Sequence, residues 1–168
     1  MIMLLAAVGS TAAALIELSL TPHLGVEGAH PHPVLVLGVI WAIVLGAESG
    51  FAWAFIGGVI LDILAERPLG STAFALLVAV GGASVLARSM SRMRPLAPIV
   101  AVPIFSLLYS LVQFAIVGAL GAPIPLGNQD PIAILLPGVG YDTALAVLVG
   151  PLAVAVKDRY TPEERVDW

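Results

Sequence analysis

An aspartate stands near the end of one of the most apolar runs of the chain, in the stretch LDILAERPLG at residues 61–70. Ionisable side chains inside apolar helices often mark proton or cation pathways, so Asp62 could serve transport. It could also hold two helices together, because an anion at the carboxyl end of a helix needs a compensating partner. Arg67, or the free amides that open the next helix around Ser71 and Thr72, would supply one. We favour the structural role because Asp62 lies near the end of its run.

A tight turn is expected directly after this aspartate. Pro68, Leu69 and Gly70 separate two apolar runs, and proline and glycine at these positions interrupt a helix and favour a short connection. We therefore predict a structurally required turn, which is also a possible partner interface, formed by Asp62, Arg67, Pro68, Leu69 and Gly70.

Other polar side chains interrupt the apolar runs further along the chain. Tyr109, Gln113 and Asp142 are predicted to be polar residues inside the membrane, with Asp142 hydrogen-bonded to Tyr109 or Gln113. A structural role is favoured for Asp142, and a proton or ligand role remains the alternative. Glu17 and Glu48 lie close to the ends of apolar runs, and the simplest interpretation places both at the membrane interface.

Metal binding and catalysis have little support. His23, His30 and His32 share one predicted loop, and the His30-x-His32 spacing could ligate a transition metal. Glu27 is the only carboxylate nearby, so a solvated, proline-rich loop is the favoured interpretation. The chain has no cysteine, and it lacks a nucleophile elbow, a phosphate-cradling glycine loop and an HExxH pair. We expect neither a cofactor nor an enzymatic activity.

The composition is that of an integral membrane protein. Of 168 residues, 60% are hydrophobic and 11% are charged, and charge-poor stretches recur along the whole length. No basic stripe suited to nucleic acid is present. We predict a single transmembrane helical domain over residues 1–156 and a short polar tail over residues 157–168.

The apolar runs predict an all-α, polytopic fold with about six transmembrane helices. A crossing needs roughly 20 residues at 1.5 Å each to span a core of about 30 Å. The expected helices cover residues 1–20, 34–45, 47–64, 71–88, 98–120 and a part of 131–156. A single tilted helix over residues 34–64 would give five spans, and this alternative stays open. A cleavable signal peptide is the less favoured interpretation of the first run, which has no basic residue at its start.

The basic residues orient these helices. Cytoplasmic loops are enriched in Lys and Arg, and two clusters separated by two spans would both face the cytoplasm. Six of the seven basic residues then lie inside, with Arg67 outside and both termini cytoplasmic. The two clusters are Arg88, Arg92 and Arg94, and Lys157, Arg159 and Arg165.

Small residues recur at intervals of four on two neighbouring helices. Such spacing lets backbones approach closely, which is how helices associate in lipid. The predicted helix-packing residues are Gly46, Gly50, Ala54 and Gly58 on one helix and Ala75, Ala79 and Ala83 on the next. Packing within the bundle is favoured over a surface for another membrane protein.

Two stretches resemble a known family. The run GAESGFAWAFIGGVILDILAERPLGSTAFALLVAVGG resembles the central signature of the rod shape-determining protein MreD family, with spaced glycines, an L-D helix end and a Pro-Leu-Gly turn. LLPGVGYDTALAVLVGPLAVAVKDRY is similar to the family's final helix. The chain departs from the family pattern at Pro31-His32-Pro33, where a proline-acidic pair is common, and at Tyr141-Asp142, where a neutral pair is more usual.

The resemblance implies a non-enzymatic component of the bacterial elongation machinery in the cytoplasmic membrane. It implies MreC as the direct partner, and indirect contact with MreB, RodA and a class B penicillin-binding protein, in directing lateral peptidoglycan synthesis. It also implies a fold similar to the S components of energy-coupling-factor transporters. The rival function is therefore a substrate-binding S component for a vitamin or small solute. Since few polar side chains would converge on one pocket, a protein partner in addition to membrane lipid is favoured.

Overall fold

The computed structural model describes residues 2–24, 30–90, 96–121 and 131–160, and the described residues form six helices without a strand. The predicted all-α polytopic fold is confirmed. Five of the helices are long and apolar enough to cross a membrane, so the chain is an integral membrane protein. The helices are α1 (Ile2–Leu24), α2 (Pro33–Leu45), α3 (Ala47–Leu64), α4 (Ser71–Ser89), α5 (Ala97–Ala119) and α6 (Pro131–Tyr160).

Glycine and proline set most of the helix boundaries, as the sequence predicts. Gly46 (φ 105°) separates α2 from α3, and Gly70 (φ 89°) precedes α4 in a left-handed conformation that glycine adopts without strain. Pro33 opens α2 at the first helical position, where its missing N–H costs no helical hydrogen bond. Two helix ends differ from expectation, since α1 continues to Leu24 and α6 continues past residue 156 to Tyr160.

The short helix α2 doubles back along α3. A Cβ placed on Gly50 would meet Ala42, and one placed on Gly57 would meet Val34, so the two helices run antiparallel. The alternative of one tilted helix over residues 34–64 is therefore wrong. With 13 residues, α2 is about 20 Å long, too short to cross a core of about 30 Å alone.

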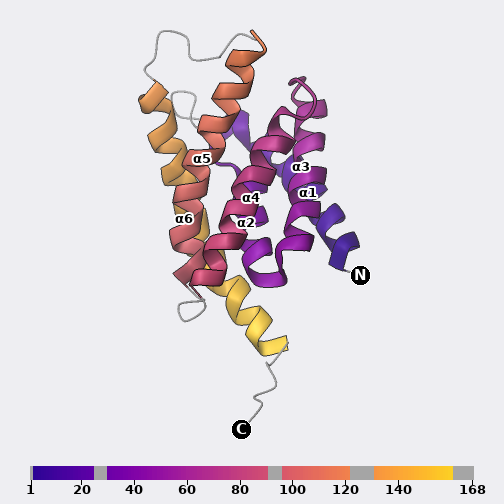
Figure 1. Cartoon of the computed structure of the whole chain (residues 1–168), viewed down its shortest axis with the longest axis vertical. Helices are drawn as coiled ribbons and strands as arrows, with labels where there is room; N and C mark the ends of the chain where they lie inside the picture. The colour runs from indigo at the N-terminus through magenta and orange to yellow at the C-terminus, as the bar shows by residue number, and fades with distance from the viewer. Residues whose placement is uncertain (1, 25–29, 91–95, 122–130, 161–168) are drawn as a thin grey trace.

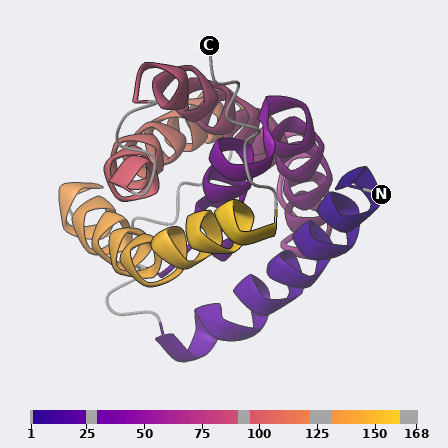
Figure 2. The same ribbon diagram turned by 90° about the horizontal axis from the view of Figure 1, so that it is seen from below.

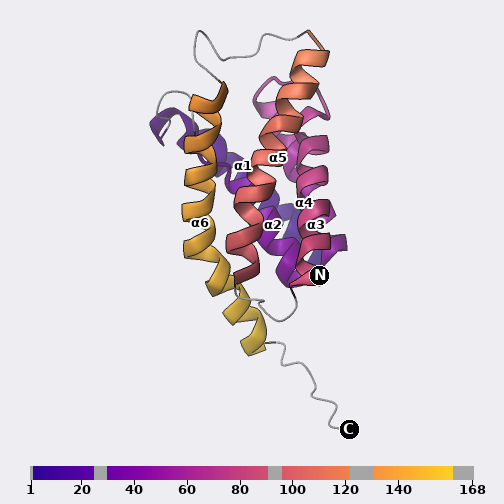
Figure 3. The same cartoon turned by 60° about the vertical axis from the view of Figure 1, so that its left-hand side comes forward.

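Helix α2 occupies the middle of the bundle, where it contacts all five other helices. Figure 2 shows it enclosed by them, and Figure 3 shows α1 crossing the bundle obliquely. The start of α1 and the ends of α4 and α6 lie toward one end of the bundle, and the α3–α4 turn lies at the other (Figure 1). The first residues of α2 are therefore buried, and they lie opposite a point just past the middle of α3.

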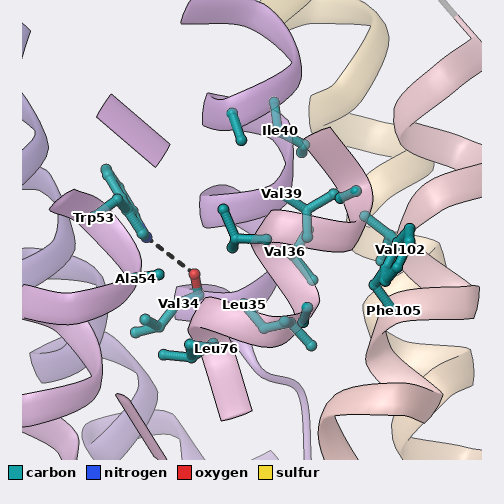
Figure 4. Close-up of a cluster of buried hydrophobic side chains, with 14 of the residues drawn as sticks. Val34, Leu35, Val36, Val39, Ile40, Trp53, Ala54, Leu76, Val102 and Phe105 are labelled. Atoms are coloured by element: carbon teal, nitrogen blue, oxygen red, sulfur yellow. Dashed lines mark hydrogen bonds between the residues drawn. The ribbon is translucent and has the colours of Figure 1, made fainter. Parts of the chain in front are cut away.

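The indole ring of Trp53 packs against Gly9 of α1 and Gly38 of α2, and Figure 4 shows it beside Val34 at one side of the buried cluster. Its Nε1 donates a hydrogen bond to the Val34 carbonyl oxygen at 3.0 Å. A Cβ on Gly9 would lie 2.6 Å from this ring, and one on Gly38 would lie 2.9 Å from it. The two glycines thus leave the space that the indole fills, as close packing of a helical bundle requires.

Candidate functional site

Asp62 lies fully buried in the last turn of α3, and its carboxylate reaches the start of α4. Oδ2 accepts a hydrogen bond from the Gly70 amide at 2.8 Å, and Oδ1 accepts one from the Thr72 amide at 3.0 Å. The Ser71 hydroxyl donates a third at 3.1 Å. The carboxylate therefore satisfies donors at the positive end of α4 that have no partner within their own helix.

The connection between α3 and α4 is a tight turn with two left-handed residues, Glu66 (φ 53°) and Gly70 (φ 89°). The Arg67 amide donates to the Asp62 carbonyl oxygen, and the Ser71 amide donates to the Pro68 carbonyl oxygen. Leu69 lies at the tip of this turn and is 76% exposed. Of the two partners considered for the Asp62 carboxylate, the geometry selects the α4 amides.

The small residues of α3 face two different helices. A Cβ on Gly58 would lie 2.3 Å from the Ala73 Cα of α4, and one on Gly50 would lie 2.5 Å from the Ala42 Cβ of α2. Gly46 was expected on this packing face, but the structure places it in the α2–α3 turn, with no atom within 4 Å of where a Cβ would stand. Four alanines of the predicted set are fully buried: Ala54, Ala75, Ala79 and Ala83.

A second polar cluster surrounds the start of α2. The Asp142 carboxylate of α6 is fully buried, and it accepts hydrogen bonds from the His32 amide at 2.7 Å and from the Ser106 hydroxyl of α5. The His32 Nδ1 lies 3.1 Å from Asp142 Oδ2. His32 and Asp142, which are 110 positions apart in the sequence, thus meet in one contact. Asp142 was expected to pair with Tyr109 or Gln113, and it bonds to these other groups instead.

Glu17 completes this cluster from α1. It is 4% exposed, and its Oε2 accepts a hydrogen bond from the Val34 amide at 3.0 Å. The expectation of an interfacial Glu17 is wrong. Because α2 begins inside the bundle, its first amides cannot reach water, and two carboxylates take the place of solvent. A signal was present in the sequence, since Ala6, Ser10 and Ala13 share the buried face of α1 with Glu17.

The remaining predicted polar residues lie beside these two clusters. The Tyr109 ring packs edge-on against His32, with ring centroids 5.5 Å apart. Gln113 Nε2 donates to the Thr72 hydroxyl oxygen at 3.4 Å, which places it close to the α3–α4 turn. Glu48 is exposed in the first turn of α3.

The histidine loop shows no metal-binding arrangement in the described residues. The His30 and His32 rings lie 4.7 Å apart, and no three His, Cys, Asp or Glu side chains of the described part are placed to hold an ion. Glu27 and the His23 side chain lie outside what the structure describes.

The pKa values of the two histidines are shifted in opposite directions. Burial, followed by the charge of His32, lowers the pKa of His30 to about 4. Burial would lower the pKa of His32 too, but the Asp142 carboxylate beside it, with a smaller effect of Glu17, raises that pKa above its ordinary value.

The contribution of His32 to stability should therefore decrease as the pH rises above 6.5, the ordinary pKa of histidine. A raised pKa in the folded state stabilises the fold below the unfolded-state pKa, and this contribution is lost as the pH passes the folded-state value. His30 acts in the opposite sense near pH 6.5, because its pKa is lowered to about 4 in the folded state, and its contribution to stability rises with pH until the unfolded chain has also lost this proton. At a pH more than about one unit above 6.5, where only the contribution of His32 still changes, we expect the melting temperature of the detergent-solubilised protein to fall as the pH rises, and His32→Gln to flatten this dependence. The same slope in His32→Gln, or its loss in His30→Gln, would contradict this assignment.

Fold and clusters together define a polytopic α-helical membrane protein in which buried carboxylates hold the starts of two helices. The chain belongs to the rod shape-determining protein MreD family, whose family model matches residues 1–129. Its place in that family gives it a role in determining rod shape, as a structural component of the shape-determining system. The match ends before α6, so the likeness of that helix to the family's final helix stays a prediction.

Neither a curated protein nor a solved structure was found to match the chain. The expected likeness to the S components of energy-coupling-factor transporters therefore stays a prediction.

Proposed function

We propose that this protein is a non-enzymatic scaffold that binds MreC in the bacterial cytoplasmic membrane. Through MreC it acts with MreB, RodA and a class B penicillin-binding protein to direct lateral peptidoglycan synthesis. Membership of the MreD family is the observation that carries this proposal. A scaffold holds a binding surface in place, and the packed helices of the described residues can support such a surface.

The buried carboxylates already accept hydrogen bonds from groups of this chain, which supports a scaffold rather than a transporter. Asp62 receives three hydrogen bonds of 3.1 Å or shorter from the start of α4. Asp142 receives hydrogen bonds from a backbone amide and from the Ser106 hydroxyl, and it contacts His32. A carboxylate whose lone pairs are already occupied has little capacity left to carry ions. Both side chains therefore serve helix placement.

The distribution of basic residues supports an orientation with both termini in the cytoplasm. Arg88 lies in the last turn of α4, and Lys157 and Arg159 lie in the last turn of α6. These two helix ends lie toward the same end of the bundle as the start of α1 (Figure 1). The positive-inside tendency assigns this end to the cytoplasm. The α3–α4 turn with Arg67 then faces the outside.

Co-purification of the tagged protein from native membranes, with mass spectrometry of bound proteins and small molecules, tests the proposal. We expect MreC in a stoichiometric amount, with or without the wall synthases. An energy-coupling ATPase module or a tightly held vitamin in place of MreC would contradict it, and would favour the S-component function.

A further inference from the structure

Arg67 is a cation that the fold leaves without an acidic partner among the described residues. Its side chain is only partly buried, and no carboxylate of the described part lies within ion-pair distance of it. The nearest candidate, Asp62, is already occupied by the α4 amides. Among the described residues, the Arg67 guanidinium makes one hydrogen bond. It is long, from Nη1 to the Thr72 hydroxyl oxygen at 3.5 Å. Most of its five N–H donors therefore remain available.

Gln113 meets Arg67 at the same threonine. Its Nε2 donates to the Thr72 hydroxyl oxygen at 3.4 Å, and its Oε1 is buried without a hydrogen-bond partner among the described residues. A buried polar atom without a partner costs free energy, so its retention needs an explanation. A partner segment that brings a backbone N–H to Oε1, while an acidic side chain of the same segment meets the guanidinium, would supply one.

Tyr109 lies one turn before Gln113 on the same face of α5. Its side chain is 3% exposed, and none of the described residues hydrogen-bonds to its hydroxyl. Arg67 and Gln113 thus bring unused hydrogen-bonding capacity to the end of the bundle at which the α3–α4 turn lies, and Tyr109 lies one turn deeper, in the middle of α5. The buried carboxylates around this group, Asp62, Glu17 and Asp142, are each engaged at a helix start. The exposed Glu66 precedes Arg67 in the turn and makes no ion pair with it.

We propose that Arg67, with Gln113 beside it, forms a binding site for an acidic side chain of the protein partner. This inference rests on the proposed scaffold function and adds the chemistry of the contact. Guanidinium and carboxylate match in charge and in planar, two-pronged geometry. The exposed Leu69 at the tip of the same turn adds an apolar contact. The occupant is thus a partner segment that carries an Asp or Glu close to an apolar residue.

Retention of full-length MreC by Arg67 variants tests this site. We expect Arg67→Gln to reduce the amount of co-purified MreC about tenfold. Arg67→Lys should reduce it less, since lysine keeps the positive charge and loses only the planar, two-pronged geometry of the guanidinium. The matched control is Arg88→Gln, which removes an arginine at the other end of α4 and should retain MreC fully. The melting temperature of each variant shows that the fold is intact.

The outcomes separate this inference from the proposed function. If the unchanged protein does not retain MreC, the proposed function fails. If it retains MreC and Arg67→Gln retains just as much, only the acidic-side-chain site is overturned.

A chemical cross-link identifies the occupant directly. In the Arg67→Lys variant, a carbodiimide activates a neighbouring carboxylate, the new side-chain amine at position 67 attacks the activated carbon, and an amide forms as the urea leaves. We expect mass spectrometry to find this amide between position 67 and an Asp or Glu of MreC. A link only to a carboxylate of the same chain, or to a small organic acid or lipid, would overturn the inference.

Discussion

Asp62→Ala should destabilise the protein by about 3 kcal/mol, since it leaves three donors at the start of α4 without a partner in a buried site. Loss of this carboxylate should loosen the α3–α4 hairpin and weaken retention of MreC. Asp62→Asn should do less harm, because one acceptor oxygen remains. Unfolding in mixed micelles, followed by circular dichroism, gives the free energy difference.

Glu48→Ala is the matched control for this substitution. It removes an exposed acid from the first turn of the same helix, where the favourable interaction with the helix dipole is about 0.3–1 kcal/mol. Equal stability of Asp62→Ala and the unchanged protein would refute the structural role. Equal loss of a proton-coupled uptake in Asp62→Ala and Asp62→Asn, with assembly intact, would favour the transport role instead.

Gly58→Ala should cost about 2 kcal/mol or more, because the new methyl group would stand 2.3 Å from the Ala73 Cα. Backbone cannot yield to it as a flexible side chain would, so α3 and α4 must move apart. The intrinsic preference of helices for alanine, about 1 kcal/mol, offsets only a part of this cost. The same unfolding measurement applies.

Gly140→Ala tests whether the cost at Gly58 comes from the contact. It makes an identical change inside α6, at a position with no atom within 4 Å of the added Cβ. We expect its stability to stay within about 0.5 kcal/mol of the unchanged protein or to rise. If Gly58→Ala behaved like Gly140→Ala, the close approach of α3 and α4 would be refuted.

The helices could be predicted from the sequence because local signals set their limits. Apolar runs predict the long helices, and Gly46 and the Pro68-Leu69-Gly70 turn interrupt them where the structure does. The role of Gly46 could not be predicted from its spacing, since a residue at the end of a four-residue pattern can lie on the helix or in the turn before it. Its φ of 105° decides for the turn.

The contacts of Glu17 and Asp142 could not be predicted, because they depend on how deep inside the bundle the first residues of α2 lie. Thirteen apolar residues show that α2 is short, but not that it starts inside the bundle. Only that start places the Val34 amide on Glu17 and the His32 amide on Asp142, a residue 110 positions away. The sequence shows the charges, and the tertiary structure decides which of them are interfacial.

The two carboxylate clusters have one physical cause. Helix α2 begins inside the bundle and α4 begins at the buried Ser71 and Thr72, and in both cases a carboxylate from a neighbouring helix accepts hydrogen bonds from the first amides. Each contact also joins separate helices, so the clusters fix the relative positions of α1, α2, α3, α4 and α6. A fixed arrangement is what a scaffold in a wall-synthesis complex requires.

Binding of purified MreC to the protein in lipid nanodiscs is the most direct test of the scaffold function. We expect saturable binding that Asp62→Ala weakens and Glu48→Ala leaves unchanged, with no energy-coupling module or bound solute required. Absence of binding by the unchanged protein, under conditions in which its helices are folded, would contradict it.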